Sequence, residues 1–275
     1  MLLVYFASIA AIICTWLLWR KMRTILRARR RTRLLAQPLP TEWQALLQRY
    51  VALYLRLPGE LREKLHGQIN YFLQDKHFVG RNGQQIDDKI RLTIAGNACL
   101  LALGHEREIF TNFKTILVYP EAFIAKQVSH DGSIVHHAKT ARAGESWHRG
   151  PLVLSWQDVL QGSIDGYDGH NVVLHEFAHK LDEENITTNG TPLLRDSSHY
   201  AQWVEVLNKE YGEFLQRVER RSNKVIDAYG AESPPEFFAV ASETFFEKPV
   251  LMQQRLPDLY EQLQRYYAVD PASWH

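Results

Sequence analysis

An apolar segment with two histidines four positions apart restricts the fold more than any other feature of the chain. Residues 172–181 read Val-Val-Leu-His-Glu-Phe-Ala-His-Lys-Leu. Because an α-helix completes a turn in 3.6 residues, His175 and His179 project from one face of such a helix and can share a metal ion. Glu176 lies beside them, where its carboxylate can take a proton from water at the metal. The apolar neighbours favour a buried helix at the floor of a cleft.

Residues 175–179 match the His-Glu-x-x-His pattern of zinc peptidases. The alternative interpretation is that two histidines are packed in the core on an amphipathic helix. A catalytic zinc ion needs a third protein ligand and one open position. The extended pattern with a third histidine is excluded, because Asp182 stands where that pattern has glycine and Asn185 stands where it has histidine.

A later segment offers a carboxylate as the third ligand. Residues 234–247 begin with two prolines, which fit the first turn of a helix, and continue with mostly apolar residues. Glu236 and Glu243 are seven residues apart, so both lie on one face of this helix. A carboxylate among apolar neighbours needs a partner, and a metal ion would be one. A salt bridge or a solvated helix face is the alternative for either residue.

The N-terminus predicts a membrane anchor. Leu2 to Trp19 are apolar or small apart from Ser8 and Thr15, and 18 helical residues rise about 27 Å, just enough to cross the hydrocarbon core. The next residues, up to Arg33, contain eight Arg or Lys and no acid. The positive-inside rule then puts the rest of the chain in the cytoplasm. We therefore expect a single-pass membrane protein with a cytoplasmic catalytic domain, which in a bacterium would be a protein of the inner membrane; a cytoplasmic protein is the alternative.

The charge and cysteine content exclude other classes of protein. The chain has a net charge of +1, and since the N-terminal segment is strongly basic, the remainder is mildly acidic. Such a body is not typical of a nucleic-acid-binding protein. The two cysteines, Cys14 and Cys99, do not indicate a disulfide framework.

Periodicity and turn residues divide the chain into three parts: residues 1–20 as the transmembrane anchor, 21–37 as a basic juxtamembrane linker, and 38–275 as a peptidase domain. Expected helices span Thr41–Leu57, Glu60–Gln74, Ile86–Leu103, Gly169–Glu183, 198–222, 234–247 and Leu256–Tyr267. Expected strands span Thr115–Tyr119, Ala122–Val128, Ser133–Thr140 and Pro151–Ser155, with a hairpin turn at Asp131-Gly132. Helices, a small sheet and more helices indicate a mainly helical α+β fold.

Several motifs together resemble the Mlc titration factor A family of bacterial zinc peptidases. They occur in the same order and with fitting separations, and the resemblance covers roughly residue 40 to the C-terminus. A more distant similarity to the catalytic domain of anthrax lethal factor includes the spacing of seven between Tyr229 and Glu236. The segments concerned are Gly150–Trp156, His175–Asp182, Ile226–Tyr229 and Pro235–Glu243.

The resemblance implies a zincin-like fold and specific roles for five residues. His175, His179 and Glu236 would bind Zn²⁺, Glu176 would be the general base, and Tyr229 would approach the metal or the developing oxyanion. It also implies aminopeptidase-like hydrolysis of a peptide or protein substrate and binding of a transcriptional repressor.

A function of another class is a membrane-anchored regulatory binding protein whose zinc site is vestigial. A structural zinc site is normally closed by four protein ligands. The sequence has no convincing fourth Cys or His ligand, which favours catalysis.

Overall fold

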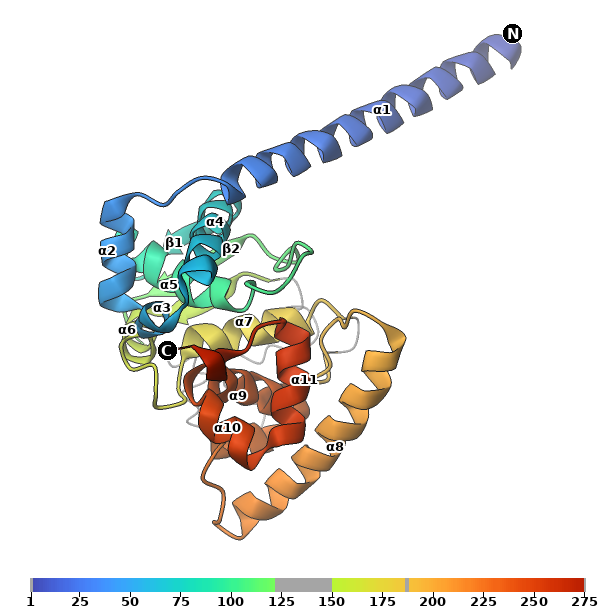
Figure 1. Ribbon diagram of the computed structural model, residues 1–275. Helices are drawn as coiled ribbons and strands as arrows, with labels where there is room; N and C mark the ends of the chain where they lie inside the picture. The colour runs from blue at the N-terminus through green and yellow to red at the C-terminus, as the bar shows by residue number, and fades with distance from the viewer. Residues whose placement is uncertain (1, 122–149, 186–187, 275) are drawn as a thin grey trace, which may run out of the picture.

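The computed structural model describes residues 2–121, 150–185 and 188–274 and has a mainly helical α+β architecture (Figure 1). The α-helices are α1 (Leu2–Leu35), α2 (Thr41–Tyr50), α3 (Ala52–Arg56), α4 (Gly59–Asp75), α5 (Asp88–Leu100), α6 (Trp156–Ile164), α7 (Val172–Asp182), α8 (Ser197–Glu219), α9 (Pro234–Glu247), α10 (Pro249–Arg255) and α11 (Pro257–Tyr267). The 3₁₀ helices are η1 (Ala228–Glu232) and η2 (Pro271–Ser273). The prediction of an α+β fold with a small sheet is confirmed.

The described strands form a parallel sheet in the order β1 (His77–Gly80), β2 (Thr115–Tyr119) and β3 (Leu152–Ser155). Helix α5 lies between β1 and β2 in the chain, as a parallel connection requires. Within the described residues, β3 lies at one edge of the sheet. The predicted strands 122–128 and 133–140 and their hairpin turn lie outside the described residues.

Local signals explain where several helices begin, and tertiary packing explains one break. Asp87 caps α5 by accepting the N–H of Ile90, and Ser155 caps α6 by accepting the N–H of Asp158. The expected helix from Thr41 to Leu57 is instead two helices, because Val51 takes an extended conformation and is buried. In this conformation the side chain of Val51 lies in the core.

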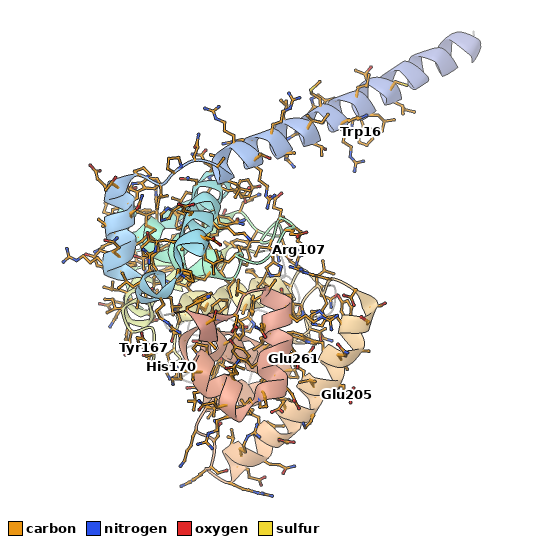
Figure 2. All side chains as sticks on the ribbon, viewed as in Figure 1. Trp16, Arg107, Tyr167, His170, Glu205 and Glu261 are labelled. Atoms are coloured by element: carbon orange, nitrogen blue, oxygen red, sulfur yellow. The ribbon has the colours of Figure 1, made fainter. Side chains whose placement is uncertain are left out.

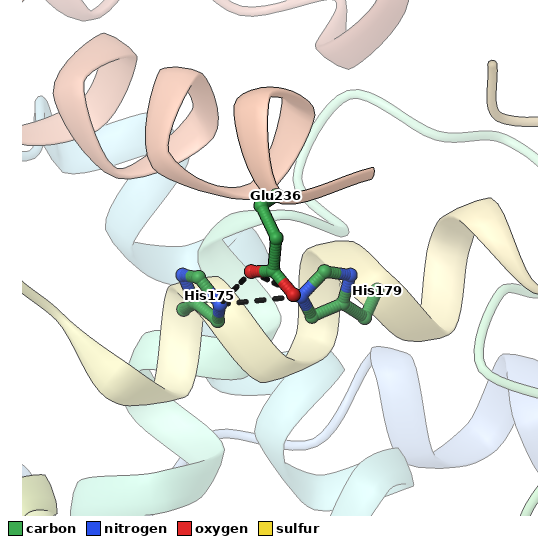
Figure 3. Close-up of side chains that lie close together, drawn as sticks. All are labelled: His175, His179 and Glu236. Atoms are coloured by element: carbon green, nitrogen blue, oxygen red, sulfur yellow. Dashed lines mark hydrogen bonds and ion pairs between the residues drawn. The ribbon is translucent and has the colours of Figure 1, made fainter. Parts of the chain in front are cut away.

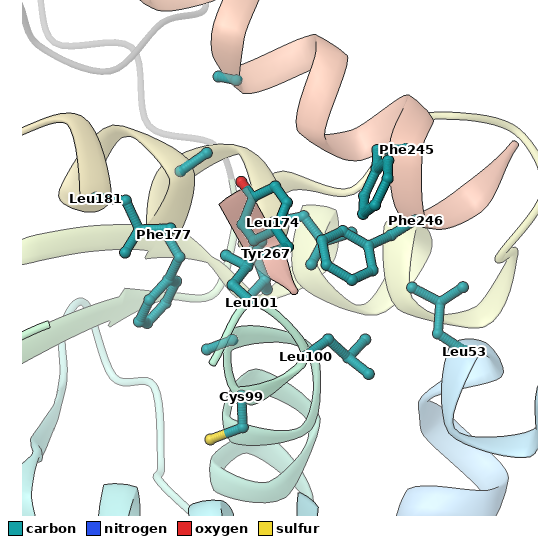
Figure 4. Packing of buried hydrophobic residues seen from close by; sticks show 14 of the residues in the cluster. Leu53, Cys99, Leu100, Leu101, Leu174, Phe177, Leu181, Phe245, Phe246 and Tyr267 are labelled. Atoms are coloured by element: carbon teal, nitrogen blue, oxygen red, sulfur yellow. The ribbon is translucent and has the colours of Figure 1, made fainter. Parts of the chain in front are cut away.

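The core joins the N-terminal helices and the sheet to the C-terminal helices through α7 (Figure 4). The ring of Phe177 in α7 is fully buried, and its centroid lies 4.9 Å from that of Phe110, 5.7 Å from that of Phe72 and 5.8 Å from that of Phe113. On the other side, Phe245 of α9 stacks on Tyr267, with centroids 5.6 Å apart. Helix α7 contacts both α5 and α9, so it lies between the N-terminal and the C-terminal parts of the core.

Helix α1 packs against α4 at its C-terminal end and extends away from the other elements at its N-terminal end. Arg30 donates a hydrogen bond to Gln74 of α4 at 2.8 Å. Gly67 allows this approach, because a Cβ atom there would collide with the main chain of Leu35. Figure 2 shows Trp16 on the part of α1 that projects away from the other elements.

The predicted transmembrane segment is not supported. None of the helices in the described residues combines the length and the apolar character that a bilayer crossing requires. Helix α1 continues without a break from the apolar residues into the basic ones, and the guanidinium groups of Arg20 and Arg23 lie over the rings of Trp16 and Trp19. The inner-membrane localisation was inferred from that segment and is equally unsupported.

Candidate metal centre

Helix α7 carries the two motif histidines on its less buried face. Asn171 caps the helix: its Oδ1 accepts the N–H groups of Val173 and Leu174, both at 3.2 Å. His175, Glu176 and His179 are half-buried, and both histidines face Glu236 of α9. The fully buried apolar residues of α7 are Val173, Leu174, Phe177, Ala178 and Leu181.

Helix α9 brings a carboxylate to the same place. It begins as its sequence predicts, with Ser233 at the N-cap and two prolines in the first turn. The hydroxyl oxygen of Ser233 accepts the N–H of Glu236 at 3.5 Å. Glu236 therefore lies in the first turn, where the partial positive charge of the helix end favours its anionic form. Its side chain turns toward α7 rather than into solvent (Figure 3).

Three donor atoms converge between the two helices. His175 Nε2 lies 3.1 Å from Glu236 Oε2 and 3.2 Å from His179 Nε2. His179 Nε2 lies 3.3 Å from Glu236 Oε2. Among the described residues, these three side chains form the group that is able to hold a metal ion. Three lone-pair atoms at these distances repel one another unless a proton or a cation lies among them.

The separations fit one tetrahedral zinc ion. Ligand atoms at about 2.0–2.1 Å from zinc and at the tetrahedral angle are about 3.3–3.4 Å apart. The observed separations of 3.1, 3.2 and 3.3 Å agree with these values to about 0.2 Å. Two imidazoles and one carboxylate are also the donor set of several catalytic zinc sites. The residues present therefore fit the metal.

The structure separates the two carboxylates that the sequence left as alternatives. Glu236 contributes to the converging donors. Glu243 lies on the other side of the His175 ring, with Oε1 2.8 Å from Nδ1 of that histidine. The spacing of seven places both carboxylates against α7, but on opposite nitrogens of one imidazole.

Without a metal ion, the charges of the site are balanced by protons. Burial lowers the pKa of His175, but hydrogen bonds with Glu236 and Glu243 and the charges of Glu243 and Glu176 outweigh it and raise the pKa to about 10. Burial opposes ionisation of Glu236, yet its contacts with both histidines hold its pKa well below the ordinary range. Burial raises the pKa of Glu176, against the opposing charges of the two histidines. A cation at this position would replace those protons.

Tyr229 lies beside the histidines. Asp227 caps η1 by accepting the N–H of Tyr229 at 2.6 Å, and this places the tyrosine ring with its centroid 5.8 Å from that of His175. The tyrosine is half-buried. The structure thus brings together all five residues that were named as the site from the sequence: His175, Glu176, His179, Tyr229 and Glu236.

Asp182, the last residue of α7, contacts the chain that follows the helix. It is buried and accepts the N–H of Gly190 at 2.8 Å, so it fixes the loop after α7. Gly190 has a φ of +79°, and a Cβ atom there would lie 2.6 Å from the carbonyl oxygen of Pro234. The same loop is therefore held against the start of α9.

Sequence reasoning missed three residues near the site. Asn171 and Glu247 form a buried polar group at the start of α7, and His170 pairs with Asp227 at 3.3 Å. Figure 2 shows His170 at the surface. The signal for Asn171 was a typical N-cap residue directly before the apolar motif helix.

Comparisons with known proteins identify relatives over most of the chain. Residues 25–268 match the family described as glucose-regulated metallo-peptidase M90. An uncharacterized protein from Synechocystis sp. is 42% identical over 93% of this chain and 90% of its own length. Mlc titration factor A from Cronobacter sakazakii is 34% identical over 84% of this chain and 87% of its own length, and the Escherichia coli protein of that name is 34% identical over 83% and 86%. The predicted resemblance is confirmed.

Proposed function

Because the chain belongs to the glucose-regulated metallo-peptidase M90 family, we propose that it is a zinc-dependent enzyme that hydrolyses peptide bonds. His175, His179 and Glu236 are the proposed zinc ligands. The observation that carries the proposal is the convergence of their three donor atoms at separations of 3.1–3.3 Å.

The residues around these donors suit hydrolysis. When bound, zinc would supply Lewis acidity, which polarises a carbonyl group and lowers the pKa of water toward about 7. Glu176 takes a proton from the attacking water and passes it to the leaving amine. Its raised pKa, caused first by burial, suits a base that must also release the proton. Tyr229 donates a hydrogen bond to the oxyanion of the tetrahedral intermediate.

The substrate and partner are proposed from the relatives. The resemblance to the Mlc titration factor A family supports aminopeptidase-like action on a peptide or protein. The name of those relatives supports binding of a transcriptional repressor as a second, regulatory role. The transmembrane anchor is not part of the proposal, because the helices of the described residues do not support it.

A substitution of the general base separates catalysis from mere zinc binding. Glu176→Gln removes the base but none of the proposed ligands. We expect the variant to keep its zinc and to lose peptidase activity by about 10²–10⁴-fold. Glu205→Gln, an equivalent change at an exposed position of α8 (Figure 2), is the matched control and should keep both. Full activity of Glu176→Gln would refute the assignment of the base.

A second variant tests the third ligand. Glu236→Ala should lose most of the zinc, measured by metal analysis after dialysis, since two histidines alone make an incomplete site. If the wild-type protein binds zinc but has no peptidase activity on any peptide tested, the alternative of a regulatory protein with a vestigial site is supported instead.

A further inference from the structure

Helix α9 places a second carboxylate, that of Glu243, against α7. The contacts of Glu243 differ from those of the proposed ligand Glu236. Glu243 is 4% exposed. Its two oxygens bind a side chain of α7 and the residue that caps this helix: Oε1 lies 2.8 Å from Nδ1 of His175, and Oε2 accepts the main-chain N–H of Asn171 at 2.5 Å. One carboxylate therefore joins the ring of His175 to the N-cap residue of the helix that carries it.

These contacts form a closed ring of hydrogen bonds. The main-chain N–H of His175 donates to the carbonyl oxygen of Asn171 at 2.9 Å, as the first turn of the helix requires. The imidazole of His175 returns to Asn171 through Glu243. Because both the main chain and the side chain of His175 are tied to the same residue, the imidazole cannot rotate without breaking a buried hydrogen bond, which costs about 1–3 kcal/mol.

Asn171 itself is held by buried polar groups from other elements. Its Nδ2 donates to Oε1 of Glu247 at 3.1 Å and to Oδ1 of Asn97 in α5 at 3.1 Å. Oε2 of Glu247 accepts the N–H of Gly169 at 2.9 Å. The start of α7 is thus anchored to α5 and to the C-terminal end of α9, and Glu243 extends this anchor to the His175 ring.

The two ring nitrogens of His175 face different carboxylates, Nδ1 that of Glu243 and Nε2 that of Glu236. A carboxylate only accepts hydrogen bonds, so the nitrogen next to Glu243, Nδ1, carries a proton. Nε2 faces Glu236 and His179 and is the nitrogen that would bind a metal ion. Histidine ligands of metals commonly donate their second N–H to a carboxylate, and removal of that partner weakens metal binding by about 10–100-fold.

We propose that Glu243 is the positioning residue of the metal centre, because it fixes the tautomer and the orientation of the His175 imidazole through Nδ1. The inference rests on the proposed zinc site and adds a residue that binds neither metal nor substrate. It also explains why α9 carries two buried carboxylates seven residues apart: one completes the donor set, and the other sets the direction of a donor.

The test is the zinc affinity of full-length variants, measured by competition with a chelator. Glu243→Gln keeps the shape but places an amide beside Nδ1; we expect zinc affinity to fall about 10–100-fold. Glu243→Asp keeps the charge but withdraws the carboxylate by about 1.5 Å, so it should also weaken zinc binding and serves if the first variant does not fold. Glu210→Gln is the matched control, since Glu210 is a buried carboxylate on α8 that pairs with Arg217.

A spectroscopic readout separates positioning from a purely structural role. The Nδ1 proton of His175 should give a downfield, slowly exchanging NMR resonance in the metal-free protein, and this resonance should shift or disappear in both Glu243 variants. Zinc affinity within threefold of wild type, together with an unchanged resonance, would overturn the inference. If the wild-type protein binds no zinc, the proposed function fails, and the resonance alone then decides whether Glu243 holds the ring.

Discussion

Substitution of Glu247 should change how the stability of the protein depends on pH. Glu247 is 1% exposed. Burial is the main cause that raises its pKa, to about 8, and the charges of Asp168 and Glu243 add to this, while hydrogen bonds from Asn171 and Gly169 oppose it. The folded state therefore holds a proton on Glu247 between pH 4.5, the ordinary value of a glutamate, and about 8. The unfolded chain has lost that proton over the same interval.

The pH dependence of the free energy of unfolding follows from the difference between the pKa of Glu247 in the folded and in the unfolded protein. The stabilising contribution is fully present below pH 4.5 and is lost as the pH rises through 8, since the unfolded state releases its proton first. At about 1.4 kcal/mol per pH unit, the wild-type protein loses up to about 5 kcal/mol over this interval. Glu247→Gln removes the titration but also one acceptor oxygen, a constant cost of about 1–3 kcal/mol.

The two stability curves should therefore cross. Below the crossing, at about pH 5–7, the wild-type protein is the more stable, and above it Glu247→Gln is the more stable. The free energy of unfolding is measured by urea denaturation from pH 5 to 8.5, with a chelator present so that metal binding does not contribute. A difference between the two proteins that stays constant with pH would show that Glu247 is already ionised in the folded state.

Three further predictions concern the core, the site and the sheet. Phe177→Ala should lower the free energy of unfolding by about 3–5 kcal/mol in urea denaturation, and a loss below 1 kcal/mol would contradict the packing of its ring among three other aromatic rings. Tyr229→Phe should lower kcat on the order of 100-fold with zinc content unchanged; an unchanged kcat excludes the oxyanion role. Val153→Pro in β3 should raise KM for peptides if an extended substrate pairs with this edge of the sheet. Unfolding of that variant would show that the strand is structural, and an unchanged KM would place the substrate elsewhere.

Local signals explain which parts of the fold were predictable. Residues 234–247 were predicted as a helix and form α9, because prolines mark its start. Strand β2 also has its predicted bounds, Thr115–Tyr119, since its apolar run is short and β-branched. The break at Val51 was not predictable, because it depends on which core position that side chain occupies rather than on a turn residue.

The candidate site was also predictable from the sequence only in part. The spacing of His175 and His179 on one helix follows from helical geometry alone. The different roles of Glu236 and Glu243 do not, since they depend on how α9 lies against α7. Asn171 and Asn97 are 74 residues apart in the chain, and no short motif contains such a contact.

Helices α7 and α9 are connected to each other at both ends, so their motions are coupled. Glu243 and Glu247 near the C-terminal end of α9 hold the start of α7. Gly190 contacts both Asp182 at the end of α7 and Pro234 at the start of α9. Neither helix can fray alone without exposing buried polar groups of the other. We therefore expect the main-chain amides of α7 and α9 to exchange with solvent deuterium as one cooperative unit. Metal binding would then slow exchange along the full length of both helices, including turns that contain no ligand.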